Sequence, residues 1–191
     1  PGVMAKLGLA PEDLLAEKPD LIVCSISGFG QSGPLSQQAA YDTVVQAMSG
    51  IMDATGWPDG PPTRVGTSVS DISAGIFGYA AVVTALVARE RTGLGTTIDV
   101  AMLDSTFALM EQSLMDSLGL GVRPERLGNR HPFICPFDTF QCADQLIAIA
   151  AGNDRLFATL CEALSLQALV GDDRFSSNAN RCENWKALKD E

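Results

Sequence analysis

The segment from Val69 to Gly93, VSDISAGIFGYAAVVTALVARERTG, constrains the fold of this chain more than any other. Polar residues and Asp71 open the segment, a long apolar run follows, and two arginines precede the closing glycine. This order is typical of a helix with a basic last turn and a glycine stop. Because the run is apolar on nearly every side, we expect a central helix buried in the core.

Asp71 falls in the first turn of this predicted helix. The first turn has free N–H groups and a partial positive charge, so a carboxylate there is kept ionised and held in one orientation. The simplest interpretation is that Asp71, or Ser70 beside it, is the N-cap of the helix. A capping carboxylate can also act as a nucleophile, so both roles stay open for Asp71.

The composition limits the class of protein. The chain has 191 residues, of which 46% are hydrophobic, enough for one domain or for one domain and part of another. Its net charge of -10 argues against a nucleic-acid binder, which needs a basic face. The five cysteines are widely spaced and lack zinc-site spacing, so we expect reduced thiols and no metal site.

The first residues do not read as a signal peptide. The first residues lack a basic start followed by an apolar block, and the apolar run Ile72–Val87 is too short to span a membrane comfortably. The chain starts without methionine and ends in the charged run ENWKALKDE. We therefore expect a fragment of a longer cytoplasmic protein.

Strands and helices alternate in the first part of the chain, residues 1–118, which predicts a parallel α/β layer. The run LIVCSIS is rich in β-branched residues, as in a strand buried on both faces. Strands are expected at Leu21–Ser27 and Thr96–Leu103, and helices at Pro11–Lys18, Tyr41–Met48, Val69–Gly93 and Asp104–Gly119.

The character of the chain changes after residue 118. Residues 119–134 are rich in glycine, proline and arginine and have little periodicity, so we expect a linker and functional loop. Residues 135–191 predict part of a small α+β domain. Its expected elements are a hairpin of Thr139–Cys142 and Leu146–Ala150, a helix capped by Asn153 or Asp154, and a last helix from about Asn178.

The loop GFGQSG, Gly28–Gly33, matches a dinucleotide-binding pattern that follows a strand. That pattern requires a helix that opens directly from the loop and an acidic residue at the end of the next strand. Here Pro34 follows the loop, and Asp53 follows a helical segment. A non-catalytic nucleotide-binding or assembly domain is therefore kept only as an alternative.

Four aspartates are the candidates for chemistry, because His131 is the only histidine. No pair of them has the spacing of a glycosidase or metal site, and the chain has no P-loop or nucleophile elbow. The residues alone thus indicate a helix-capping carboxylate near glycine loops in an enzyme-like α/β domain. The four are Asp42, Asp71 and Asp104 near helix starts, and Asp99 in a strand.

Long ordered segments resemble the class III CoA-transferases of the CaiB/BaiF type, which include formyl-CoA transferase and carnitine CoA-transferase. The resemblance extends over nearly the whole chain. It is carried by SISGFGQSGP (Ser25–Pro34), AYDTVVQAMSGIMDATGWPDGPPTRVGTSVSDISAG (Ala40–Gly75), ARERTGLGTTIDVAMLD (Ala88–Asp104) and GNRHPFICPFDTF (Gly128–Phe140).

The resemblance implies the second half of a Rossmann-like large domain, part of a small α+β domain, and an interlocked homodimer. It also implies CoA esters as substrates, no permanently bound cofactor, and a nucleophilic aspartate that passes through an anhydride and an aspartyl-CoA thioester. The family motif D-x-x-x-G places this aspartate at Asp71, in VSDISAG. A nucleophilic carboxylate at a helix start agrees with the favourable positive charge of the first turn.

Further positions carry over from the family pattern. The segment that lies along CoA corresponds to Ala39, Ala40, Tyr41 and Asp42, and Lys6, shortly after Pro1–Gly2, corresponds to a basic contact to CoA phosphate. Tyr41 could equally be a half-buried aromatic residue and Lys6 a solvated charge. His131 lies in the loop corresponding to one that covers the active site, although we favour a structural role for it.

The α-methylacyl-CoA racemases share this fold and are the second alternative. Their motif has a histidine where this chain has Tyr41. Since racemisation needs two bases and tyrosine is a poor base at neutral pH, Tyr41 favours CoA transfer.

Overall fold

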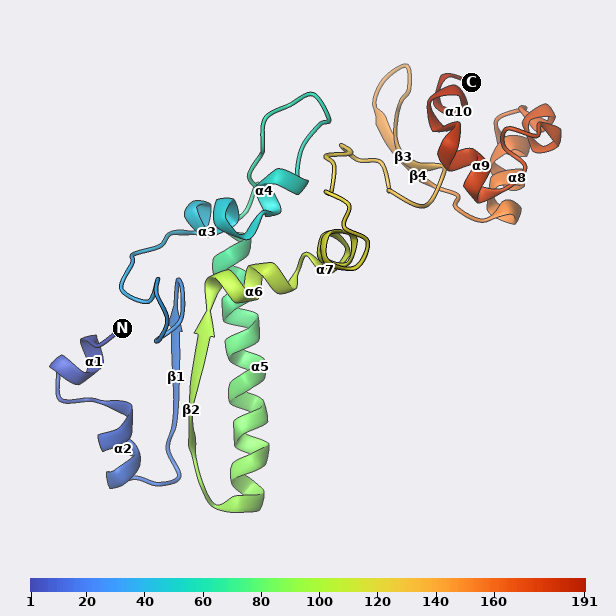
Figure 1. Cartoon of the computed structure of the whole chain (residues 1–191). Coiled ribbons are helices and arrows are strands. Elements are labelled where there is room, and N and C mark those ends of the chain that lie inside the picture. The colour runs from blue at the N-terminus through green and yellow to red at the C-terminus, as the bar shows by residue number, and fades with distance from the viewer. The chain divides into compact units, whose positions relative to one another are not determined.

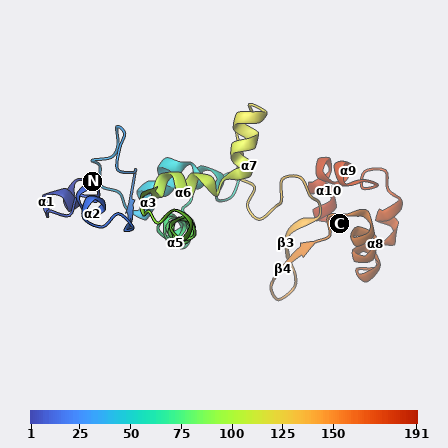
Figure 2. The ribbon, with the colours of Figure 1, turned by 90° about the horizontal axis from the view of Figure 1, so that it is seen from below.

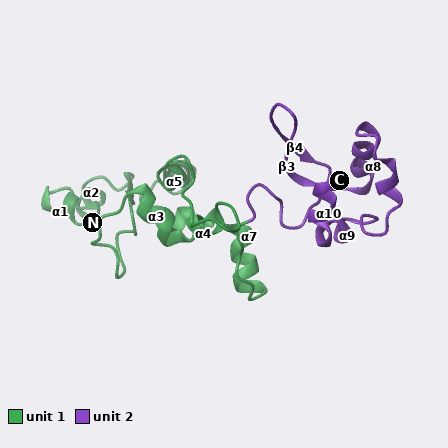
Figure 3. Cartoon of the chain, turned by 90° about the horizontal axis from the view of Figure 1, so that it is seen from above, with its two compact units in different colours: residues 1–126 green, residues 127–191 purple.

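The computed structural model describes residues 1–191, which divide into two compact units (Figure 3). The first unit is Pro1–Arg126 and the second is Leu127–Glu191. The division lies within residues 119–134, the segment expected to be a linker. Each unit has its own two-stranded sheet.

The first unit is built on a two-stranded parallel sheet. The strands β1 (Ile22–Ser27) and β2 (Thr96–Ala101) pair in register from Ile22 opposite Thr96 to Ser27 opposite Ala101. The long helix α5 (Val69–Thr92) packs on both strands and runs back along them, so its first turn lies at their carboxyl ends (Figure 1). The predicted parallel α/β layer is confirmed.

Shorter helices complete this unit, and their bounds are α1 (Val3–Lys6), α2 (Pro11–Glu17), α3 (Asp42–Ser49), α4 (Ile51–Ala54), α6 (Met102–Ala108), α7 (Glu111–Leu114) and the π-helical turn η1 (Met115–Gly119). The helices α3, α5 and α6 pack on one another. The helices α1 and α2 lie beside β1, away from α5 (Figures 1 and 2). Glycines in the left-handed conformation end two helices: Gly93 after α5, as predicted, and Gly50 after α3.

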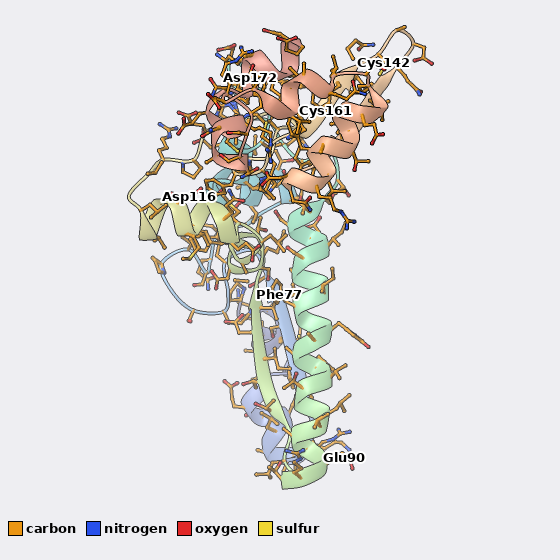
Figure 4. The ribbon with its side chains drawn as sticks, turned by 90° about the vertical axis from the view of Figure 1, so that its right-hand side faces the viewer. Phe77, Glu90, Asp116, Cys142, Cys161 and Asp172 are labelled. Atoms are coloured by element: carbon orange, nitrogen blue, oxygen red, sulfur yellow. The ribbon has the colours of Figure 1, made fainter.

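Two expectations for this unit are wrong. The single helix expected at Asp104–Gly119 is divided, because α6 ends at Ala108 and α7 starts only at Glu111. The helix α5 is also not buried all round. The small residue Gly78 faces the strands, whereas large apolar side chains of α5 are exposed, among them Tyr79 and Phe77, the latter labelled in Figure 4.

The reason for this exposure is that, within residues 1–191, only one face of α5 has packing partners. A Cβ atom added at Gly78 would lie only 3.0 Å from the Ile26 side chain. The helix therefore approaches β1 closely at this position. With 24 residues, α5 is long and apolar enough to cross a membrane by length and composition alone, so the expectation that its apolar run is too short for a span is wrong by this criterion. Core helices of soluble proteins meet the same criterion, and α5 packs along two strands.

An ion-paired cluster holds the last residues of the first unit. The carboxylate of Asp53, in α4, accepts hydrogen bonds from Arg123 at 2.9 Å and from Arg126 at 2.8 Å. The hydrogen bond from Arg123 is the main cause that lowers the pKa of the Asp53 carboxyl below its ordinary value, and Arg126 adds to it. The cluster therefore attaches the segment before the unit boundary to α4.

The second unit contains the antiparallel hairpin β3 (Phe137–Gln141) and β4 (Leu146–Ala150), which confirms the predicted hairpin with an earlier first strand. Asn153 caps the next helix, since its Oδ1 accepts from the N–H of Leu156 at 2.9 Å. A helix starts at Asn178, as expected, but it ends at Glu183 and a further helix follows it, so it is not the last one. The helical elements are α8 (Asp154–Ala163), the 3-10 turn η2 (Gln167–Gly171), α9 (Asn178–Glu183) and α10 (Trp185–Asp190).

The core of the second unit forms around Phe157, Cys161 and Phe175, and Cys161 is labelled on α8 in Figure 4. The fully buried side chain of Arg181 lies against this core, with its guanidinium 4.6 Å from the centre of the Phe157 ring. It donates to the carbonyl oxygens of Cys135 and Phe175 and to the carboxylate of Asp154. A buried cation is tolerated here because most of its donors have acceptors.

Candidate active site

The carboxylate of Asp71 lies in the first turn of α5, at the carboxyl ends of β1 and β2. This edge of a parallel sheet is where open α/β folds bind ligands. Asp71 is exposed, and no hydrogen bond or ion pair within the chain involves its side chain. Its carboxylate oxygens are therefore free to meet a ligand from outside the chain.

The N-terminus of α5 is capped by a residue from another helix. The N-cap position is Ser68, whose side chain makes no capping hydrogen bond. Instead, Oδ1 of Asp42, the first residue of α3, accepts from the N–H of Ser70 at 3.0 Å. The interpretation of Asp71 or Ser70 as the side-chain cap of this helix is therefore wrong, and Asp71 is left without a capping role.

Gln46, one turn after Asp42 on α3, attaches the segment that leads into α5. Its amide nitrogen donates to Oδ2 of Asp42 at 2.7 Å and to the carbonyl oxygen of Thr67 at 3.2 Å. Its amide oxygen accepts from the N–H of Val65 at 2.8 Å. Both side chains are buried, Gln46 completely and Asp42 with 8% of its surface exposed. The backbone before Asp71 is therefore held to α3 at three points.

Tyr41 precedes Asp42 and is 81% exposed, so its ring is available to a ligand. The hydrogen bond from Ser70 to Asp42 joins the residues next to Tyr41 and Asp71, and so brings the two chain segments together. Before Tyr41, Ala40 lies against Gly28, where an added Cβ would collide with the Ala40 side chain. The structure thus brings Ala39, Ala40, Tyr41 and Asp42 to the same sheet edge as the first turn of α5.

The glycine loop after β1 is attached to β2 and the start of α6. The backbone N–H of Gln31 donates to Oδ2 of Asp99 at 2.8 Å, and that of Leu103 donates to the carbonyl oxygen of Gly28 at 3.1 Å. No helix opens from the loop, because the next helix is α3, which starts at Asp42. The geometry required for a dinucleotide-binding loop is therefore absent.

Lys6 is not part of this group of residues. It ends α1, is exposed, and lies on the side of β1 away from α5 (Figure 1). A cavity of about 590 Å³ lies next to α1 and is lined by residues 1–5 and by parts of β1 and β2, including Ser27 and Asp99. Lys6 follows directly on the lining residue Ala5, so a contact of Lys6 with CoA phosphate stays a prediction.

His131 belongs to the second unit, where it stabilises a loop. Its ring stacks on Phe137 with 5.1 Å between ring centres, and its Nδ1 accepts from the N–H of Phe133 at 3.1 Å. These contacts fit the structural role favoured from the sequence. No group of three or more His, Cys, Asp or Glu side chains in residues 1–191 is arranged to hold a metal ion.

Sequence reasoning missed the role of Gln46 and the backbone contact of Ser70 with Asp42. The spacing of Asp42 and Gln46, four residues apart on a predicted helix, indicates that their side chains meet, but not what they hold. Ser70 is completely buried, and its hydroxyl has no hydrogen-bond partner. No sequence signal identifies Ser70 as the donor to Asp42, because the two residues lie 28 positions apart.

An α/β unit with a free carboxylate at the carboxyl ends of parallel strands defines a candidate enzyme site, and comparison with known proteins gives the family. The family model of CoA-transferase family III matches residues 1–191. The chain belongs to CoA-transferase family III.

The chain is similar to several named transferases. It is 53% identical over 190 residues to the acetyl-CoA:oxalate CoA-transferase of Acetobacter aceti, covering 99% of this chain and 49% of that protein. It is 44% identical over 178 residues to the succinate–glutarate CoA-transferase of Agrobacterium fabrum, covering 93% of this chain and 44% of that protein. The chain thus spans about half the length of these relatives.

A solved structure has the same fold. A CAIB/BAIF family protein from Brucella suis superimposes with a TM-score of 0.84 at 41% identity, covering 99% of this chain and 50% of that one. The resemblance to the CaiB/BaiF-type CoA-transferases stated from the sequence is therefore confirmed.

Proposed function

We propose that the protein containing this chain transfers CoA from an acyl-CoA donor to a carboxylic acid, with Asp71 as the nucleophile. The observation that carries the proposal is the exposed carboxylate of Asp71, which lies at the start of α5 without an internal partner. Membership of CoA-transferase family III supports the reaction class. The dipole of α5 favours negative charge at this position, where an attacking carboxylate is required.

The reaction proceeds through three covalent states of Asp71, which are an anhydride with the donor acid, a thioester with CoA and an anhydride with the acceptor acid. A carboxylate oxygen attacks the thioester carbonyl of the donor, the C–S bond breaks, and a mixed anhydride forms as CoA thiolate leaves. The thiolate attacks the aspartyl carbonyl of the anhydride, which releases the donor acid and leaves an aspartyl-CoA thioester. The acceptor carboxylate attacks the aspartyl carbonyl of this thioester, the C–S bond breaks, and a second mixed anhydride forms as CoA thiolate leaves. The thiolate then attacks the acceptor carbonyl of that anhydride, which forms the product acyl-CoA and releases the carboxylate of Asp71. No permanently bound cofactor takes part.

The acceptor that we propose is a small dicarboxylic acid. The names of the two relatives contain oxalate in one case and succinate and glutarate in the other, and all three are dicarboxylates. Acetyl-CoA and succinyl-CoA are accordingly the first donors to test. The proposed contacts to CoA are Lys6 and the segment Ala39, Ala40 and Tyr41. The side chain of Asp42, which the family resemblance also assigned to CoA, is instead engaged by Ser70 and Gln46.

We further propose the assembly that the family resemblance implies. Residues 1–118 contribute to a Rossmann-like large domain, residues 119–134 form a linker and loop, and residues 135–191 contribute to a small α+β domain. The full-length protein is proposed to form an interlocked homodimer in the cytoplasm, without nucleic-acid or membrane partners. Size-exclusion chromatography with light scattering tests the dimer directly.

The reaction is tested by mass spectrometry of the full-length protein after incubation with acetyl-CoA, succinyl-CoA and other acyl-CoAs. Hydroxylamine converts an activated aspartate to its hydroxamate, which peptide mapping locates. We expect the modification on the Asp71 peptide of the wild-type protein and none in the variant Asp71→Ala, which should also lose transfer. Turnover retained by that variant would remove Asp71 from the mechanism. Racemisation of an enantiopure 2-methylacyl-CoA without an adduct would favour the racemase alternative.

A further inference from the structure

The buried Asp42 carboxylate is used entirely inside the first unit. Its two oxygens accept from the N–H of Ser70 and from the amide of Gln46, and only 8% of the residue surface is exposed. A buried carboxylate requires such donors, and hydrogen bonds to a charged acceptor are about twice as strong as neutral ones. A direct side-chain contact with the phosphate groups of CoA would add repulsion between like charges.

These contacts control where Asp71 lies. Ser70 is the residue before Asp71, and its N–H is one of the free donors in the first turn of α5. Gln46 binds the backbone of Val65 and Thr67. The segment that leads to Asp71 is therefore bound to two positions of α3, Asp42 and Gln46, which lie one turn apart. Because α3 also packs on α5 and α6, the two side chains connect the first turn of α5 to a packed group of helices.

We infer that Asp42 is a positioning residue for Asp71: its carboxylate caps α5 from α3 and fixes the orientation of the neighbouring nucleophile. The inference rests on the proposed function, since it assigns Asp42 a role in that reaction. In this role the Asp42 side chain does not contact CoA. It instead acts on Asp71 through its hydrogen bond to the backbone N–H of Ser70. Gln46 acts with Asp42 by holding both the carboxylate and the preceding loop.

The expected signature is a loss of turnover without a loss of substrate affinity. Attack on a thioester requires close alignment, and a displacement of about 1 Å can reduce a rate by about 100-fold. In the full-length protein, we expect Asp42→Ala to lower kcat about 10- to 100-fold while KM for the acyl-CoA changes less than about 3-fold. The rate of hydroxylamine-trapped modification at Asp71 should fall in parallel.

The variant Asp42→Asn separates positioning from general damage to the fold. Its amide oxygen can still accept from Ser70, whereas its amide nitrogen cannot accept from Gln46. We expect Asp42→Asn to recover most of the lost kcat, and thermal unfolding to show that both variants are folded. The matched control is Asp13→Asn in α2, an exposed first-turn carboxylate without a hydrogen-bond partner in the chain, which should leave both constants unchanged.

Three results would overturn the inference. A raised KM for acyl-CoA with unchanged kcat would make Asp42 a CoA contact, and wild-type values of both constants in Asp42→Ala would leave it without a role. Hydrogen exchange of the Ser70 amide gives a readout that does not depend on activity. Faster exchange is expected in Asp42→Ala, and unchanged exchange would refute the cap. If the wild-type protein formed no Asp71 adduct, the proposed function would fail instead, and this exchange would still test the cap.

Discussion

Nε of the buried Arg181 donates a hydrogen bond to the carbonyl oxygen of Cys135, 2.8 Å away in the second unit. The same guanidinium reaches the carbonyl oxygen of Phe175 at 3.0 Å. A planar group with fixed donors is required to serve these acceptors together, and lysine has a single ammonium on a flexible chain. Arg181, in α9, therefore connects the segment just before β3 to the turn that precedes α9.

We predict that Arg181→Lys lowers the free energy of unfolding by about 2–3 kcal/mol, because at least one buried carbonyl oxygen loses its donor. Thermal and denaturant unfolding of the full-length protein measure this change. The control is Arg155→Lys in α8, whose exposed side chain makes no hydrogen bond or ion pair within the chain. Equal stability of the two variants would contradict the connecting role of Arg181.

We predict that Cys135 resists alkylation at alkaline pH. Burial raises the pKa of the Cys135 thiol from 9.0 to about 11, and the nearby Cys182 adds to this effect. Between these two pH values the native thiol stays protonated, whereas the thiol of the unfolded chain ionises. The raised pKa thus stabilises the fold fully below pH 9, and this contribution is lost as the pH rises toward 11.

The measurement for Cys135 is iodoacetamide labelling of the native and the urea-unfolded protein at pH 9.5, followed by peptide mass spectrometry. Labelling of Cys135 should be at least about ten times slower in the native protein, because the thiolate is the reactive form. Equal labelling rates in the two states would show that the Cys135 thiol is not buried and that its pKa is not raised.

We predict that Gly28→Ala disturbs the segment carrying Tyr41. The new Cβ would collide with the Ala40 side chain, so the two ends of the loop would have to separate. Overpacking of this kind costs about 1–3 kcal/mol. We expect a lower melting temperature and a raised KM for acyl-CoA. Gly171→Ala in η2 has open space around its Cβ and should change neither quantity.

Much of the fold can be predicted from local sequence patterns. The apolar run before Gly28 and the alternating residues around Asp99 identify the two strands, and Gly93 marks the end of α5. These signals are local because strand and helix periods depend on near neighbours. The break between α6 and α7 was missed, since the residues around it are ordinary helix formers without glycine or proline.

The candidate site is less accessible to sequence reasoning. The position of Asp71 in the first turn can be read from the helix pattern, but the cap that holds this turn comes from Asp42 on another helix. Such a contact depends on how α3 and α5 pack, and periodicity does not determine packing. The expectation that α5 is buried all round is wrong for a related reason. A sequence pattern shows which faces of a helix are apolar, but it does not show which of those faces pack against other elements.

Because β1 and β2 pair residue by residue, the position of the loops at their carboxyl ends depends on the length of each strand. Ser27 and Ala101 are partners at the end of the ladder, so the glycine loop and α6 leave the sheet at one level. Deleting one residue of β2 before Asp99 would displace the remainder of that strand by about 3.3 Å and turn each of its following side chains to the opposite face. Asp99 would then no longer meet Gln31, and one deletion distant from Asp71 in sequence would dismantle the loop beside it.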